Sequence, residues 1–190
     1  MEKPLAGKTV ALLVANGFEE LEMTEPQRAL LAAGAAIKIV SPEQGLVNGW
    51  HGRGWGHYFP VDVPIAEALA ADFDALIVPG GPRSIEKLTG NAHSKRLTRG
   101  FVDGGKPVVL QGHGVTLLTV AERAAGRTVA AAEEIAEAMR TAGCVVSEET
   151  VAVDGAMLTT RGEEEDMAID RETLVQHIVD NLEAAAAAAA

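Results

Sequence analysis

Four short apolar segments, separated by longer polar stretches, constrain the fold of this 190-residue chain most strongly. The first, Thr9 to Ala15 (TVALLVA), is continuously apolar, which is typical of a strand buried on both faces of a parallel sheet. Similar segments follow at Ala36 to Val40, Asp74 to Val78 and Pro107 to Leu110. Strands that alternate with helices predict an α/β fold with a doubly wound, mostly parallel sheet and helices on both faces.

The stretches between these strands carry helical signals. Phe18 to Ala33 is predicted to be a helix because its apolar residues recur near helical spacing and Gly34 follows where a helix would end. Asn91 to Asp103 and Glu133 to Thr141 are also predicted helices, and Glu163 to Leu182 is expected to close the chain as another.

Two segments interrupt the alternation. Gly45 to Pro60 is rich in glycine and aromatic residues and lacks a helical period, so it is interpreted as a loop or a hairpin. Near the end of the chain, Thr150 to Val153 and Met157 to Thr160 flank the dipeptide Asp154-Gly155. This pattern predicts a β-hairpin.

Composition favours one soluble domain in the cytoplasm. No repeat or Pro/Ser-rich linker divides the chain, so one domain is expected over residues 1–183, and the seven alanines at 184–190 are interpreted as tag residues. The formal net charge of -11 argues against nucleic acid or a membrane as a partner, and no apolar run approaches the roughly 20 residues of a membrane span. The single cysteine and the absence of a signal-peptide pattern favour a reducing compartment.

Three turns at the carboxyl ends of predicted strands are candidate parts of a site, because ligands bind at this edge of open α/β sheets. After the first strand, Glu19 and Glu22 lie one helical turn apart at a helix N-terminus, where carboxylates also complement the helix dipole. Pro79-Gly80-Gly81 follows the third strand, and its N–H groups are expected to form an oxyanion hole. Many such tripeptides only reverse the chain.

The third turn follows the strand that ends in Val108 to Leu110 and resembles a nucleophile elbow, a sharp strand-to-helix bend. Gly112 is its central residue, His113 follows, and a helix is expected to begin near Val115, which is expected to line the pocket with Gly80 and Gly81. The central residue of such a bend has positive φ, which glycine adopts without the strain of about 1–3 kcal/mol that a side chain costs. We therefore expect the bend to be present.

Cys144 follows a predicted helix and is expected to be a buried structural thiol. Trp50, His51, Trp55 and His57 lie in the glycine-rich excursion. They are expected either to line a small pocket or a subunit contact, or to pack locally under a loop.

A set of longer motifs links these features in a fixed order. They are NGFEELEMTEP at 16–26, GWHGRGWG at 49–56, FPVDVPIAEA at 59–68, DFDALIVPGGPRSIEKL at 72–88, GKPVVLQGHGVTLL at 105–118, GRTV at 126–129 and TVAVDGAMLTTRG at 150–162. Through them nearly the whole chain before the alanines resembles the ThiJ/PfpI family, which includes intracellular protease I and the parkinsonism-associated deglycase. The resemblance implies a flavodoxin-like fold, shared with class I glutamine amidotransferases, and a homodimer or higher homo-oligomer.

The resemblance also assigns residue roles, with one departure. Family members usually have a cysteine at the elbow position that Gly112 occupies. Glu22 or Glu19 would hydrogen-bond that thiol, His113 would follow the nucleophile, and Glu86 would approach this histidine across a dimer contact. Glycine supplies no side-chain atom for covalent chemistry, so cysteine-dependent protease, amidase or deglycase activity is expected to be absent.

Three functional hypotheses follow. The first is a stress-associated binding or chaperone-like protein that retains a small-molecule pocket without the thiol. The second is a hydrolase or glyoxalase-type enzyme in which Glu22, His113 and a bound water act by general acid–base chemistry. The third is that the natural protein carries cysteine at position 112 and that glycine was introduced there. The five histidines show no metal-ligand spacing, so neither a metal nor another cofactor is expected.

Overall fold

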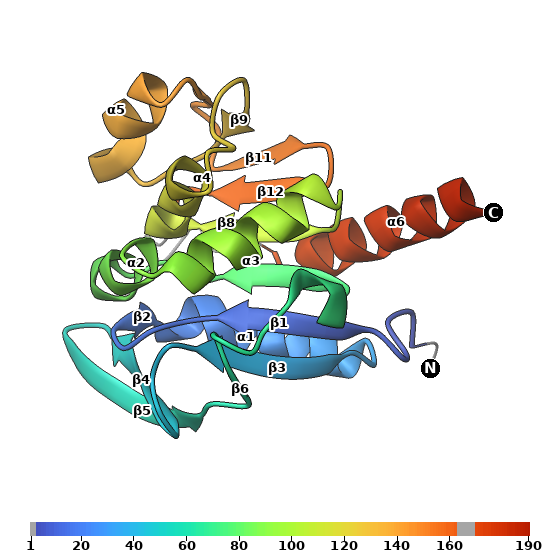
Figure 1. The fold of residues 1–190 in the computed structure, drawn as a ribbon, viewed down its shortest axis with the longest axis horizontal. Coiled ribbons are helices and arrows are strands. Elements are labelled where there is room, and N and C mark those ends of the chain that lie inside the picture. Colours follow the sequence, from blue (N-terminus) through green and yellow to red (C-terminus); the bar gives the residue numbers. More distant parts are fainter. Residues whose placement is uncertain (1–2, 163–169) are drawn as a thin grey trace.

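The computed structural model describes residues 3–162 and 170–190 and arranges the predicted strands in one central sheet (Figure 1). Its strands are β1 (Thr9–Leu13), β3 (Ala36–Ser41), β6 (Val63–Pro64), β7 (Ala75–Val78), β8 (Val108–Gln111), β11 (Val151–Asp154) and β12 (Met157–Thr160). They are ordered β11-β12-β8-β7-β1-β3-β6. Every pair is parallel except the predicted hairpin of β11 and β12. The predicted α/β fold class is therefore confirmed.

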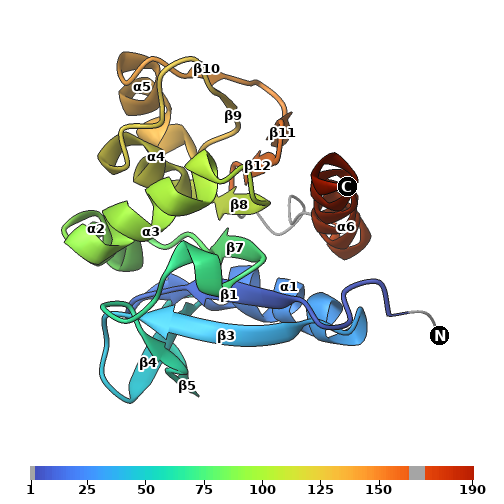
Figure 2. The same ribbon diagram turned by 45° about the vertical axis from the view of Figure 1, so that its right-hand side comes forward.

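Helices cover both faces of this sheet (Figures 1 and 2). They are α1 (Glu20–Ala32), α2 (Pro82–Thr89), α3 (Ala92–Asp103), α4 (Leu117–Val120), α5 (Glu133–Thr141) and α6 (Arg171–Ala189), with 3-10 turns at Ala70–Asp72 and Gly112–Thr116. Figure 2 shows α1 and α6 side by side on one face and α2, α3 and α4 on the other. Each face therefore buries its own apolar core.

The central strand β1 explains why the first apolar run has no polar interruption. Val10 and Leu12 belong to the core under α1 and α6, whereas Ala11 and Leu13 belong to the core under α2 and α3. All four side chains are fully buried. Because successive residues of a strand point to opposite faces, a strand covered on both sides is apolar at every position.

The glycine-rich excursion is a hairpin beside the main sheet. Its strands β4 (Leu46–His51) and β5 (Gly54–Pro60) pair with β2 (Phe18–Glu19) in the order β2-β4-β5. The predicted helix from Phe18 was wrong by two residues, because Phe18 and Glu19 form parallel bridges to Gly49 and Trp50. A further small sheet pairs β9 (Thr128–Val129) with β10 (Val145–Val146).

The closing helix is described from Arg171 onward. Residues 163–169 of the predicted helix lie outside the described residues, and α6 begins at Arg171 after Asp170, whose carboxylate accepts a hydrogen bond from the N–H of Thr173. The helix continues through the alanines to Ala189, as expected from the high helix propensity of alanine. Among the residues that the structure describes, no helix has the length and apolar character needed to cross a membrane.

Candidate functional site

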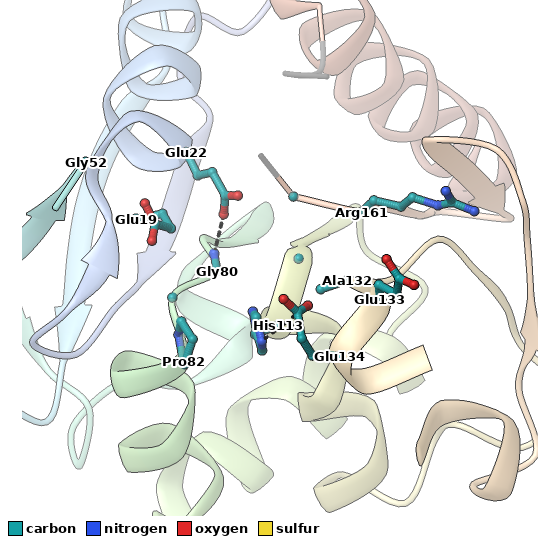
Figure 3. A pocket seen from close by; sticks show the side chains of 13 residues that line it. Glu19, Glu22, Gly52, Gly80, Pro82, His113, Ala132, Glu133, Glu134 and Arg161 are labelled. Atoms are coloured by element: carbon teal, nitrogen blue, oxygen red, sulfur yellow. Dashed lines mark hydrogen bonds and ion pairs between the residues drawn. The ribbon is translucent and has the colours of Figure 1, made fainter. Parts of the chain in front are cut away.

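A cavity of about 510 Å³ opens at the carboxyl ends of the central strands. Gly80 and Gly81 follow β7, Gly112 and His113 follow β8, and Arg161 with Gly162 follows β12. Figure 3 shows these segments around one opening, with the start of α1 on one side and the start of α5 on the other. The cavity lies where the doubly wound topology predicts a ligand site.

The bend after β8 has the geometry of an elbow. Gly112 has a φ of 53°, and the chain passes directly from β8 into the 3-10 turn Gly112–Thr116. The helical turn thus starts at Gly112, earlier than the predicted start near Val115. A Cβ atom at position 112 would lie 3.7 Å from Oε1 of Glu22 and 3.3 Å from Cα of Gly162. A side chain at this position would therefore stand beside the Glu22 carboxylate.

Glu22 is held in place from two strands. It is 6% exposed, and its Oε2 accepts a hydrogen bond of 2.5 Å from the N–H of Gly80. The side-chain amide of Gln111 donates to the Glu22 carbonyl oxygen at 2.7 Å. The N–H of Gly80, which the sequence predicts to serve an oxyanion hole, thus donates to the carboxylate of Glu22 in this structure.

The other predicted residues separate into two groups. Glu19 and Gly81 line the cavity, and the N–H of Glu19 donates to the carbonyl oxygen of Gly80. Val115 is fully buried in the core and is not among the described lining residues, which corrects its predicted place in the pocket. Glu86 is exposed on α2 and outside the cavity. Its role across a subunit contact stays a prediction.

His113 lies at the floor of the cavity near the first turn of α5. Its side chain is 24% exposed, and its Nε2 is 4.0 Å from Oε2 of Glu134, whose side chain is 73% exposed. Figure 3 shows the two side chains next to each other. The pair is too long for a direct hydrogen bond but close enough for a proton to pass through one bridging water.

Sequence reasoning missed three charged residues of the cavity: Glu133, Glu134 and Arg161. With Glu19 and Glu22 they place four carboxylates and one guanidinium around one opening. Arg161 had a usable signal, because polar residues directly after a buried parallel strand belong to the carboxyl edge of the sheet. In residues 3–162 and 170–190, no group of three or more His, Cys, Asp or Glu side chains is arranged to hold a metal ion.

The aromatic side chains of the β4–β5 hairpin pack locally rather than in the cavity. The Trp50 and Trp55 rings meet edge to face with centroids 5.5 Å apart, and the Arg83 guanidinium lies 4.2 Å from the Trp50 ring. His57 binds Glu20 through both its ring and its backbone N–H. Burial raises the pKa of Glu20, but these hydrogen bonds outweigh it, and the pKa lies below its ordinary value.

The thiol of Cys144 is remote from this chemistry. It is buried, as predicted, and donates to the carbonyl oxygen of Ala124 at 3.1 Å. Burial raises the pKa of the Cys144 thiol above its ordinary value, which lowers the fraction of reactive thiolate. Cys144 is not among the described residues that line the cavity.

Comparison with known proteins extends over most of the chain. General stress protein 18 of Bacillus subtilis (strain 168) is 33% identical over 170 residues, which is 88% of this chain and 96% of the relative. Protein/nucleic acid deglycase 2 of Escherichia coli (strain K12) is 34% identical over 169 residues, with the same two shares. Both relatives are similar to the chain over nearly their full length.

Solved structures agree with the fold. The ThiJ/PfpI domain protein from Brachyspira murdochii has a TM-score of 0.79 at 21% identity, covering 95% of this chain and 98% of that one. DJ-1 from Schizosaccharomyces pombe has a TM-score of 0.73 at 18% identity, covering 93% and 90%. The sequence profile of the DJ-1/PfpI family matches residues 8–176. The chain therefore belongs to the DJ-1/PfpI family.

Proposed function

We propose that this protein binds a small amine-bearing molecule without covalent chemistry in the cavity at Gly112. The observation that carries the proposal is the elbow itself. Gly112 forms the strand-to-helix bend at a φ of 53° beside the carboxylate of Glu22, yet it presents only hydrogen to the cavity. A site built in this way can position a ligand, but it has no thiolate to attack one.

The charge of the cavity supports an amine as the bound group. The described lining residues carry a single guanidinium, that of Arg161. They carry four carboxylates, those of Glu19, Glu22, Glu133 and Glu134. Such a field attracts groups that carry positive charge and donate hydrogen bonds. The net charge of -11 acts in the same direction at long range.

The test compares three proteins: the unsubstituted chain, Gly112→Cys and Gly112→Ala. Methylglyoxal consumption and peptide hydrolysis are measured for each, because one relative is named a deglycase and the family resemblance includes a protease. We expect no turnover with glycine or alanine and a gain only with cysteine. Gly112→Ala is the matched control, since it carries the same backbone strain without a thiol. Measurable turnover by the glycine and alanine proteins contradicts the proposal.

A second candidate function rests on the His113–Glu134 pair. A histidine 4.0 Å from a carboxylate in an open cavity can act as a general base through water, in a hydrolase or glyoxalase-type reaction. Under this alternative the unsubstituted chain turns over substrate, and His113→Asn abolishes the turnover. Glu134→Gln then lowers the rate about 10- to 100-fold by analogy with other acid–base pairs.

We also propose that the protein acts as a homo-oligomer in a stress-associated role, which its family and the name of the Bacillus subtilis relative support. Glu86 is exposed on α2, where a neighbouring subunit could place it near His113. Sedimentation velocity should give at least a dimer. A monomer at micromolar concentration contradicts this proposal.

A further inference from the structure

A second cavity adjoins the Gly112 cavity. It measures about 480 Å³ and shares two lining residues with the first, Glu133 and Arg161. Its remaining wall includes the guanidinium of Arg140 and the apolar side chains of Ala136 and Val146. Glu133 and Arg161 therefore stand at the boundary of both cavities.

The two cavities differ in charge. The first carries four carboxylates against the guanidinium of Arg161. The second carries two guanidiniums, those of Arg140 and Arg161, against the carboxylates of Glu133 and Glu148. In Figure 3 the side chains of Glu19 and Glu22 lie on one side of the opening and that of Arg161 on the other. A ligand in the first cavity can therefore reach from the carboxylates of Glu19 and Glu22 on one side to the guanidinium of Arg161 on the other.

Arg161 differs from most arginines of the chain in its partners. Arg99, Arg123 and Arg127 each form an ion pair with a carboxylate. Within the part of the chain that the structure describes, the hydrogen bond of the Arg161 side chain runs from Nη2 to the carbonyl oxygen of Ser147, at 3.3 Å. A guanidinium has five N–H donors in a planar fork that matches a carboxylate, and the contact with Ser147 uses one of them.

We infer that the site recognises a zwitterionic aminocarboxylate, with its ammonium group toward Glu19, Glu22 and Glu134 and its carboxylate on Arg161. This inference rests on the proposed function in one respect, that the Gly112 cavity binds an amine. It adds a second point of recognition and names Arg161 as the residue that selects a carboxylate. The apolar wall at Ala136 and Val146 accommodates methylene groups close to that carboxylate.

Three probes of matched length test the inference by isothermal titration calorimetry: 6-aminohexanoate, hexylamine and hexanoate. We expect 6-aminohexanoate to bind the full chain at least about tenfold more tightly than either single-charge probe, which corresponds to about 1.4 kcal/mol. Arg161→Gln should remove this advantage while changing hexylamine affinity less than about twofold. Arg161→Lys should restore part of it, because lysine keeps the charge without the fork.

Two controls keep the test decisive. Arg123→Gln removes a guanidinium that pairs with Asp103 outside both cavities and should bind all three probes as the unsubstituted chain does. If Arg161→Gln fails to fold because the Ser147 contact is lost, Arg140→Gln removes the other guanidinium of the second cavity and keeps that contact. It should then lower 6-aminohexanoate affinity relative to hexylamine.

The inference is overturned if 6-aminohexanoate binds no more tightly than hexylamine, or if a folded Arg161→Gln protein keeps the full advantage. Hexylamine binding without a gain from the carboxylate overturns this inference alone and leaves the proposed amine site intact. Turnover by the unsubstituted chain contradicts the proposed function alone, because turnover does not depend on whether Arg161 selects a carboxylate. Absence of binding by all three probes overturns both.

Discussion

Two glycines face each other at the bend after β8, and they tolerate a side chain to different degrees. Gly112 and Gly162 both have positive φ, 53° and 84°. A Cβ atom on Gly162 would lie 2.8 Å from Cα of Gly112, whereas a Cβ atom on Gly112 would lie 3.3 Å from Cα of Gly162. Backbone atoms yield less easily than flexible side chains, so Gly162 is the more constrained position.

Alanine substitutions should reveal this order. We expect Gly112→Ala to lower the free energy of unfolding by about 1–3 kcal/mol through backbone strain. Gly162→Ala should cost at least about 1 kcal/mol more, because its Cβ also collides with backbone. Gly155→Ala is the control for φ alone, since Gly155 has a φ of 59° and no atom within 4 Å of its Cβ position. Urea unfolding measures all three, and equal losses at 112 and 162 would refute the order.

Glu20 should make stability depend on pH. Its folded pKa is lowered, with burial opposing and the hydrogen bonds from His57 dominating. The stability that ionised Glu20 contributes to the folded state is therefore complete above the ordinary carboxyl pKa. It is lost as pH falls through the lowered pKa. Glu20→Gln should cost about 1–3 kcal/mol at pH 7 and flatten the loss of stability in acid. Thermal melting from pH 7 to pH 3 measures this, with the exposed Glu149→Gln as control. If Glu20→Gln loses thermal stability between pH 7 and pH 3 as steeply as the unsubstituted chain does, the prediction is wrong.

At the scale of elements, Asn48 joins the two strands of the β4–β5 hairpin to each other and to the loop after β1. The buried Asn48 amide donates to the carbonyl oxygens of Gly56 and His57 at 3.0 and 2.9 Å, across an irregularity in the strand register. Its backbone N–H donates to the side chain of Asn16. These bonds position the hairpin tip, where Gly52 reaches the cavity.

Asn48→Ala should therefore loosen the hairpin without unfolding the sheet. Two partly exposed carbonyl oxygens lose their donor, at a cost of about 0.5–1.5 kcal/mol. We expect amide hydrogens of β5 to exchange faster with deuterium while those of β8 stay protected. Unchanged protection in β5 would show that Asn48 does not hold the hairpin.

Elements with a strong local signal were predictable, and those set by tertiary pairing were not. The central strands were predicted to within two residues at each end, since a strand buried on both faces is apolar throughout. Phe18 and Glu19 were predicted to begin a helix, but their backbone pairs with β4. The two-residue strands β6, β9 and β10 exist only through their neighbours, so no sequence period marks them.

At the scale of the whole molecule, the site was predictable where it follows from the carboxyl ends of adjacent parallel strands. Glu22, Gly81 and Gly112 meet there because β1, β7 and β8 are neighbours in the sheet. Glu133 and Glu134 escaped prediction because the position of α5 over this edge depends on the long connection after β8. Val115 was assigned to the pocket, but the first turn after the bend directs it into the core.

The most direct test of the account follows glycine amides during a titration with hexylamine. In protein labelled with ¹⁵N-glycine, the amide signals of Gly112 and Gly162 should shift saturably and return after dialysis. Those of Gly105 and Gly155, which lie outside the cavity, should stay in place. Shifts confined to the outer glycines, or an adduct at the cavity that survives dialysis, would contradict a non-covalent binding site at the elbow.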